Sequence, residues 1–262
     1  VSVIAGEGAG MESEYDFAHA VHFGDLEDPA DVGRRAGEKA AARIGARRMP
    51  TAEVPVIFDP RVAGGLLGHL TGAITGPAIA RGTSFLKDRL GDQLFAADIE
   101  IVDDPHRKRG LRSKPFDAEG IANSKRSIVK DGVLTTWLLD LASAKQLGLE
   151  TTGHAGRGTS GPPSPGPSNL YLTPGTLSPA ELMADIEAGL YITSLMGMGV
   201  NGVTGDYSRG ASGFWIENGE IAFAVSEVTI AGNLKDMFAS LSAANDLEFR
   251  YGTNVPTLRI EG

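Results

Sequence analysis

The chain has no cysteine among its 262 residues. Disulfide bonds, thiolate metal ligands and thiol nucleophiles are therefore excluded, and with them cysteine peptidases and cysteine-ligated zinc sites. The chain also lacks any uninterrupted apolar stretch approaching the roughly 20 residues that a membrane-spanning helix needs. Its first residues do not form a basic region followed by an apolar segment, as a secretory signal would. These absences lead us to expect a cytoplasmic protein with no membrane association.

Basic residues are in deficit, since 24 Lys and Arg stand against 33 Asp and Glu and give a formal net charge of −9. Such a balance does not suit a phosphate-binding surface unless the basic residues cluster. The only dense basic stretch runs from His106 to Lys114, directly after Asp103 and Asp104. A solvated loop explains it better than a binding surface. The sequence thus predicts no direct nucleic-acid binding.

Two hairpins are predicted by turn chemistry. The apolar runs 214–216 and 221–223 flank a turn centred on Asn218 and Gly219, and Asn-Gly is a strong hairpin signal because both residues tolerate positive φ. The tripeptide Lys130-Asp131-Gly132, also between apolar runs, predicts a second hairpin. With 42% hydrophobic residues the chain can bury a sizeable core.

Two Asp-Pro pairs predict helix starts, because Asp is a favoured N-cap and Pro a favoured first helical residue. The first pair predicts a helix over 29–45, and the second a helix over 60–74 that follows a strand at 54–58. In the second helix Gly64, Gly65, Gly68 and Gly72 each cost about 1 kcal/mol relative to Ala, which predicts close approach of another backbone or group. Further helices are expected at 83–90, 141–147, from 178 and, after Gly232-Asn233, at 234–241, with strands at 94–102, 190–193, 247–251 and 258–260.

Strands, hairpins and scattered helices without a regular βαβ alternation indicate an α+β fold, with mixed, largely antiparallel sheets and several flanking helices rather than a doubly wound parallel sheet. Because the chain starts at Val1 without an initiator Met, residues 1–26 are expected to be the tail of a missing N-terminal domain or its linker. Residues 27–262 would form the C-terminal domain. Within it, the Gly-, Pro- and Ser-rich stretch 151–168 predicts a mobile loop.

The segment 197–202 matches the pattern G-x-G-x-x-G of dinucleotide-binding proteins. That pattern requires a following helix whose N-terminal amides face the pyrophosphate, whereas here a further turn and the predicted hairpin follow. We therefore interpret the match as fortuitous.

No metal or triad motif stands in the sequence. The histidines do not form H-E-x-x-H, and no serine lies in G-x-S-x-G. His69 has no His or Glu three or four residues away, which favours a structural role. The loop from Thr204 to Gly210 gathers hydroxyls and both charges between glycines, which suits contact with a peptide or a partner. The alternative is that Asp206 caps its own turn and pairs with Arg209.

The chain resembles the PmbA (TldE) branch of the TldD/PmbA family over nearly its whole length. The resemblance rests on a collinear series of segments: VPVIFDPRVAGGLLGHLTGAITG, RGTSFLKDRLGDQL, KPFDAEGI, VKDGVLTTWLLDLASAKQLGLETTGHAG and VTGDYSRGASGFWIENGEIAFAVSEVTIAGNLKDM. It implies a bacterial cytoplasmic peptidase of two subunits, which degrades unfolded or short peptides, matures a microcin precursor and modulates DNA gyrase.

In TldD-type subunits, as the resemblance implies, the helix after the VPVIFD-like strand carries an H-E-x-x-x-H zinc motif, and a cysteine adds a ligand. Alignment on Gly82-Thr83-Ser84 places Leu67, Gly68 and Gly72 at the three motif positions. None of these side chains can bind metal. The resemblance therefore implies a subunit without catalytic or metal-binding residues of its own, in a heterodimer with a TldD-like partner that holds the zinc. In isolation such a subunit can also form a homodimer.

Two rival functions remain. A stand-alone hydrolase would use His69, His154 and carboxylates such as Asp206. A peptide-binding module would grip an extended chain by strand addition between the 151–168 loop and the loop near residue 204. On all these grounds, the residues expected to contact a peptide or a partner are His69, His154, Thr204, Asp206, Ser208 and Arg209.

Overall fold

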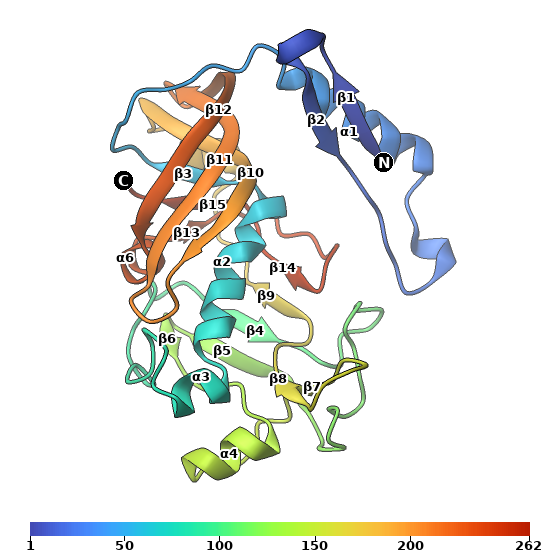
Figure 1. Ribbon diagram of the computed structural model, residues 1–262, viewed down its shortest axis with the longest axis vertical. Helices are drawn as coiled ribbons and strands as arrows, with labels where there is room; N and C mark the ends of the chain where they lie inside the picture. Colours follow the sequence, from blue (N-terminus) through green and yellow to red (C-terminus); the bar gives the residue numbers. More distant parts are fainter.

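The computed structural model describes residues 1–262, the side chain of Ala9 excepted, and it has a small N-terminal part and a larger part (Figure 1). In the small part, strands β1 (Ser2–Ala5) and β2 (Glu12–Tyr15) pair antiparallel, and helix α1 (Pro29–Ala42) packs against both. Two short 3-10 turns, η1 (Gly8–Gly10) and η2 (Phe23–Asp25), complete it. We call residues 1–42 the N-terminal unit.

The first sheet of the larger part has six strands in the order β12-β11-β10-β3-β15-β13. Only the β3–β10 pair is parallel among the described strands of this sheet. The long strands β10, β11 and β12 form a meander that extends well beyond the short ones (Figure 1). The strand bounds are β3 (Val56–Phe58), β10 (Ala188–Val200), β11 (Asp206–Glu217), β12 (Glu220–Asn233), β13 (Ser242–Ala243) and β15 (Leu258–Ile260).

The second sheet has five strands in the order β14-β9-β4-β5-β6, and here β14 and β9 run parallel. Its strands are β4 (Ile101–Asp103), β5 (Arg126–Lys130), β6 (Val133–Leu134), β9 (Leu170–Leu172) and β14 (Thr253–Asn254). A separate pair, β7 (Ala155–Gly156) and β8 (Ser164–Pro165), lies inside the predicted loop 151–168. That the loop is mobile stays a prediction.

Helix α2 (Pro60–Ala73) lies between the two sheets (Figure 1). Its buried residues, Leu66, Leu67 and Leu70 among them, join one hydrophobic core with strands of both sheets. The shorter helices are α3 (Gly76–Ala80), α4 (Leu141–Leu147), α5 (Pro179–Met183) and α6 (Leu234–Ala239). Within the residues that the structure describes, no helix is long and apolar enough to cross a membrane.

The predicted α+β class with mixed, largely antiparallel sheets is confirmed. Both Asp-Pro helix starts are also confirmed, because Asp28 accepts a hydrogen bond from the Ala30 N–H and Asp59 one from the Arg61 N–H, each at 2.9 Å. The Asn218-Gly219 turn joins β11 to β12, and both residues have positive φ.

Three predicted elements are wrong. Residues 83–90 form turns rather than a helix, because the Ser84 side chain accepts a hydrogen bond from the Leu86 N–H. In 94–102 only the last two residues are in a strand. The backbone N–H groups of Leu94 and Phe95 both donate to the carbonyl of Gly132, so these residues do not form a regular strand pair. Residues 247–251 form no strand, because the Asn254 side chain accepts the N–H groups of Arg250 and Tyr251 and bends the chain.

Candidate functional site

A cavity of about 330 Å³ lies beside α2 at the far ends of β10 and β11. We call it the α2 cavity. It combines the exposed glycines of the helix with apolar side chains from the end of β10 and from the segment after α3. It is lined by Gly68, His69, Gly72, Ala73, Ala78, Thr83, Phe85, Gly197, Met198, Val200, Gly202, Arg209 and Leu234.

The glycines of α2 leave open space. A Cβ atom added to Gly65, Gly68 or Gly72 would have no heavy atom within 4 Å, and one added to Gly64 would meet only ordinary contacts at 3.8 Å with Thr253. Close approach by another part of this chain is therefore wrong for this helix, and approach by a peptide or a partner stays a prediction. Gly68 and Gly72 instead contribute volume to the cavity, which longer side chains at these positions would occupy.

His69 points from α2 toward β11, where its ring lies 5.9 Å from that of Tyr207 in an edge-to-face arrangement. Burial, followed by the nearby positive charge of Arg209, lowers the pKa of His69 and so favours its neutral form. Burial also raises the pKa of Tyr207 to about 12. Arg209 is thus the one permanent charge in the cavity lining.

Asp206 lies close to Arg209 in sequence, yet it turns away. Its carboxylate accepts hydrogen bonds from the Thr204 hydroxyl at 2.6 Å and the Asn233 amide at 3.1 Å, and these bonds hold its pKa below the usual value. The Nε–H of Arg209 donates instead to the Met196 carbonyl oxygen at 3.1 Å. The alternative of an Asp206–Arg209 pair is wrong in the described structure.

Strand alternation explains this separation. Residues 206–210 belong to β11 and are not a loop as predicted. Successive side chains of a strand point to opposite faces: Tyr207 is buried and Arg209 half-buried, while Asp206 and Ser208 are exposed. Of the six predicted residues, only His69 and Arg209 line the α2 cavity. Thr204, Asp206 and Ser208 lie near it on the turn and on the other face of β11.

His154 occupies a different region. It is buried, its Nδ1 lies 2.8 Å from the Thr152 hydroxyl oxygen, and its Nε2 lies 3.4 Å from an Asp103 carboxylate oxygen. The same carboxylate accepts the N–H and the hydroxyl of Ser168, both at 2.7 Å. This network fixes both ends of the 151–168 segment to β4. It does not bring His154 to His69 or Asp206, as a stand-alone hydrolase would need.

The zinc-motif positions offer no metal donors. Leu67 is only 1% exposed and belongs to the hydrophobic core, and Gly68 and Gly72 have no side chains. Across the described part of the chain, no group of three or more His, Cys, Asp or Glu residues is arranged to hold a metal ion. The residues of this helix therefore do not fit a zinc ion.

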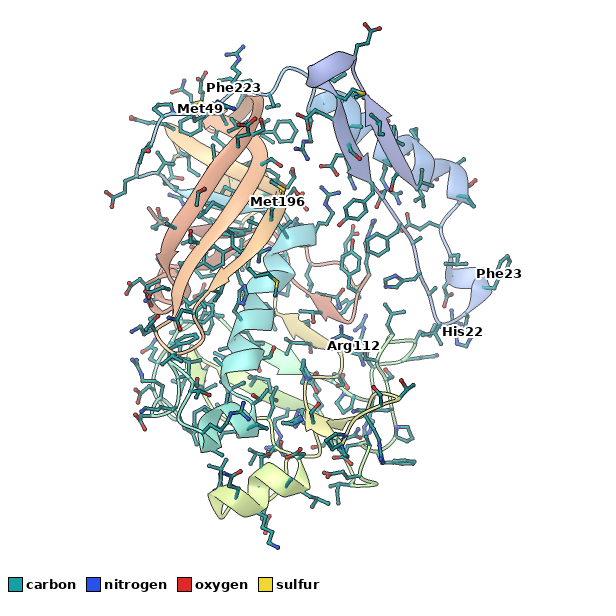
Figure 2. The ribbon with its side chains drawn as sticks, in the orientation of Figure 1. His22, Phe23, Met49, Arg112, Met196 and Phe223 are labelled. Carbon is teal, nitrogen blue, oxygen red and sulfur yellow. The ribbon has the colours of Figure 1, made fainter. Side chains whose placement is uncertain are left out.

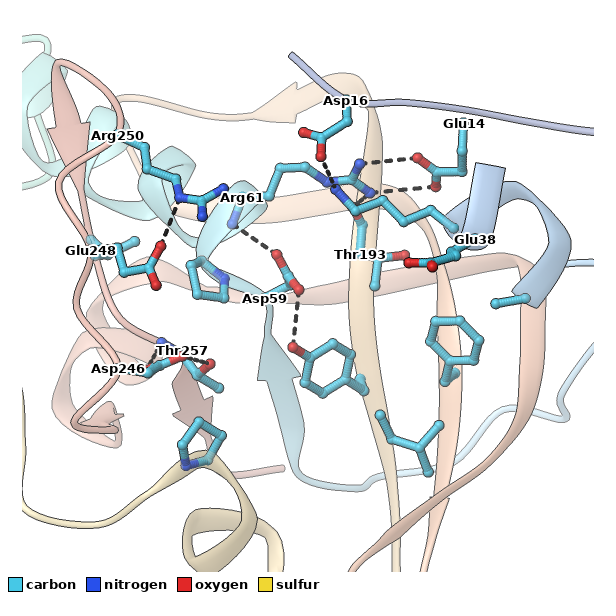
Figure 3. Close-up of a pocket in the computed structure, with 18 of the residues that line it drawn as sticks. Glu14, Asp16, Glu38, Asp59, Arg61, Thr193, Asp246, Glu248, Arg250 and Thr257 are labelled. Atoms are coloured by element: carbon cyan, nitrogen blue, oxygen red, sulfur yellow. Dashed lines mark hydrogen bonds and ion pairs between the residues drawn. The ribbon is translucent and has the colours of Figure 1, made fainter. Parts of the chain in front are cut away.

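A larger cavity, of about 600 Å³, lies between the N-terminal unit and the larger part, and sequence reasoning missed it (Figure 3). We call it the N-terminal cavity. Glu14, which is only 4% exposed, accepts hydrogen bonds from Arg43 at 2.8 Å and from Arg61 at 3.0 Å. Arg61 also donates to the Tyr15 and Thr193 carbonyls. No local pattern reveals this site, because its residues are up to 132 positions apart.

A second pair of residues on the wall of this cavity is likewise joined by a hydrogen bond. The Tyr191 hydroxyl donates to Asp59 at 3.0 Å, and the same carboxylate caps α2 through the Arg61 N–H. Burial and then the Asp59 charge raise the pKa of Tyr191 far above its usual value. These groups therefore bind one another within the larger part, whereas the bonds of Arg61 to Glu14 and to the Tyr15 carbonyl hold the N-terminal unit against the first turn of α2.

Comparison with known proteins places residues 51–262 in a domain family described as the PmbA/TldA metallopeptidase C-terminal domain. The chain is 43% identical to "Metalloprotease PmbA" of Escherichia coli O157:H7 over 266 residues, which is 99% of this chain and 57% of that protein. It thus spans little more than half the length of this relative.

Solved structures share the fold. A protein from Bacteroides thetaiotaomicron named as a modulator of DNA gyrase superposes with a TM-score of 0.90 at 30% identity, over 100% of this chain and 57% of its own. One from Thermotoga maritima with a similar name gives 0.89 at 33%, over 99% and 60%. The matched domain and the relatives agree with the resemblance seen in the sequence, and the chain belongs to the PmbA/TldD metallopeptidase family.

Proposed function

We propose that this chain acts as the non-catalytic, PmbA/TldE-like subunit of a cytoplasmic two-subunit peptidase. A TldD-like partner supplies the zinc ion and the hydrolytic residues, and the pair cleaves unfolded or short peptides. The roles in microcin maturation and DNA gyrase modulation that the family resemblance implies belong to the same proposal.

One observation carries the proposal: α2, on which the family resemblance places the zinc ligands of TldD-type subunits, has no metal donor at the three motif positions of this chain. Leu67 faces the core, while Gly68 and Gly72 open space in the α2 cavity. Each glycine inside a helix lowers its stability by about 1 kcal/mol relative to alanine. Since no packing requires these glycines, we infer that they are kept for the room they leave to a peptide or a partner segment.

The edge of β10 supports a contact with an extended chain. Strand β3 pairs only with Leu190–Ile192 of β10, and the next carbonyl, that of Thr193, accepts a hydrogen bond from Arg61. Beyond Thr193, no strand of the described chain pairs with that edge up to Val200. This edge adjoins the α2 cavity, which Gly197, Met198 and Val200 line. Unpaired backbone groups at a sheet edge can bind a peptide by strand addition. A peptide-binding module that needs no peptidase partner is the second candidate function.

The proposal is tested by measuring peptidase activity of this chain alone, a TldD-like subunit alone, and the two mixed. We expect turnover of an unfolded polypeptide only when the TldD-like subunit is present, with the highest rate for the pair. Metal analysis of the purified chain should show far less than one zinc per chain. Stoichiometric zinc, or turnover by this chain alone, would overturn the proposal.

The role of the glycines is tested with Gly72→Leu in the same mixture. The added side chain meets no neighbouring atom at its Cβ, so the variant should fold and assemble, but it should lower turnover by the pair. Gly65→Leu is the matched control, because Gly65 lies on the same helix, is equally open and does not line the α2 cavity. Wild-type turnover by an assembled Gly72→Leu variant would contradict this role.

A further inference from the structure

The ionisable side chains that line the α2 cavity are all basic. The chain carries a net charge of −9, yet none of the described residues that line this cavity is an Asp or a Glu. Its only ionisable lining residues are His69 and Arg209. The nearest carboxylate in sequence, Asp206, is held on the other face of β11 by Thr204 and Asn233. The cavity therefore favours an anionic group over a cationic one.

Arg209 is placed to bind such a group. Its Nε–H donates to the Met196 carbonyl at 3.1 Å, which fixes the plane of the guanidinium. Its two terminal Nη groups make no hydrogen bond and no ion pair with the described residues. The side chain is half-buried, so water screens it only partly. A fixed guanidinium with two free N–H groups matches a carboxylate, which it can bind through two parallel hydrogen bonds.

The rest of the lining suits one residue of a peptide. Phe85, Met198 and Leu234 provide apolar walls, and Gly68 and Gly72 leave the floor open. A volume of about 330 Å³ is at the small end of ligand sites. The end of β10 and Arg209 of β11 line the same cavity, so a peptide that adds to the edge of β10 beyond Thr193 would end at the cavity that Arg209 lines.

We propose that the α2 cavity is a carboxylate-binding pocket in which the Arg209 guanidinium holds a carboxylate of a bound peptide. The inference rests on the proposed peptide-contacting function and names the group that this subunit recognises. The carboxylate has two sources with the same chemistry, the C-terminus of the peptide or the side chain of an internal Asp or Glu.

The test measures binding to this chain alone, by fluorescence anisotropy of three N-terminally labelled six-residue peptides of Gly, Ala and Ser. The first has a free C-terminal carboxylate, the second is amidated, and the third is amidated with one internal Glu. We expect the first or the third peptide to bind about tenfold or more tightly than the second, which lacks a carboxylate, since a charge-assisted pair is lost there.

Arg209→Gln should abolish that preference, and Arg209→Lys should restore part of it. Arg48→Gln is the control of equal charge, because Arg48 is exposed and pairs with Glu227 away from the cavity. Preference for the free C-terminus assigns the pocket to peptide ends, and preference for the internal Glu assigns it to acidic side chains. Equal binding of all three peptides, no binding of any, or a preference unchanged in Arg209→Gln would overturn the inference. Because no partner is present, these results are independent of the test of the two-subunit peptidase.

Discussion

The two cavities of this chain differ in whether their charged side chains are paired. In the N-terminal cavity, Glu14 is shared by Arg43 and Arg61, and Asp59 binds Tyr191 and caps α2. In the α2 cavity, the guanidinium of Arg209 has only the Met196 carbonyl as a partner among the described residues. The first set of charges is satisfied within the fold, whereas the second is left available.

The difference shows which charges serve the fold. No residue of the N-terminal unit belongs to the hydrophobic core clusters of the described chain. Its attachment depends on ion pairs and on ring contacts, such as Phe17 against Tyr251 at 5.5 Å. Figure 2 shows His22 and Phe23 at the outer end of the N-terminal unit and Arg112 on the main body. Removing a paired charge should therefore loosen this unit, while removing Arg209 should leave the fold intact.

The largest effect is expected for Glu14→Ala. Removing a buried carboxylate leaves Arg43 and Arg61, each with a side chain 12% exposed, without their main partner. Breaking a buried pair in this way costs about 3 kcal/mol. We expect this loss to appear as detachment of the N-terminal unit, measured as faster amide hydrogen exchange in α1 and faster proteolysis between residues 43 and 55.

Glu38→Ala is the control, because Glu38 also pairs with an arginine, Arg34, but both side chains are more than half exposed. Exposed pairs contribute little to stability, so this variant should exchange and digest like the wild type. Equal behaviour of the Glu14 and Glu38 variants would show that the buried pair does not hold the N-terminal unit.

Low pH should also weaken the attachment of the N-terminal unit to the larger part. Burial opposes the charge of Glu14, but hydrogen bonds from Arg43 and Arg61 outweigh it and lower the pKa. The pKa of Asp16 is also lowered, against burial, mainly by its hydrogen bond from Arg35, and this pair lies within the N-terminal unit itself. A lowered folded pKa contributes stability that is present above the ordinary value, 4.5 for Glu and 3.8 for Asp, and lost as the pH falls through the folded value.

The measurement is proteolysis of the linker 43–55 by pepsin, as a function of pH from about 5 downward. We expect cleavage to increase as the pH falls below the ordinary carboxyl pKa values, and Glu14→Gln to be cleaved more readily already at pH 5. The effect of acid should be smaller than that of Glu14→Ala, because a protonated Glu14 carboxyl still accepts hydrogen bonds. A cleavage rate independent of pH, after correction for the enzyme's own profile, would contradict the prediction.

Local signals account for the parts of this structure that the sequence predicted correctly. Helix caps at Asp28 and Asp59 and the Asn218-Gly219 turn depend on neighbouring residues only, so they could be read directly. Of the six predicted contact residues only His69 and Arg209 line one cavity, because residues 206–210 form a strand rather than a loop, and strand alternation separates Asp206 from Arg209. The N-terminal cavity could not be predicted, since the Arg61 bond to Thr193 links distant segments.

The glycines of α2 show the same limit, and they give the smallest expected effect. The sequence predicts the cost of these glycines to stability, but the reason for their presence depends on what surrounds the helix. Since a Cβ at Gly68 or Gly72 meets nothing within 4 Å, Gly68→Ala and Gly72→Ala should each raise the free energy of unfolding by up to about 1 kcal/mol, measured by urea denaturation.

Gly76→Ala is the opposing control, because its Cβ would lie 2.1 Å from the Ser143 Oγ atom and 2.9 Å from Leu139; that variant should lose stability. If Gly68→Ala were also destabilising, a contact on this face of α2 would have to exist, and the open floor of the α2 cavity would be wrong. If it is stabilising, the wild-type chain gives up stability at this helix for space, which is the expected trade at a binding site.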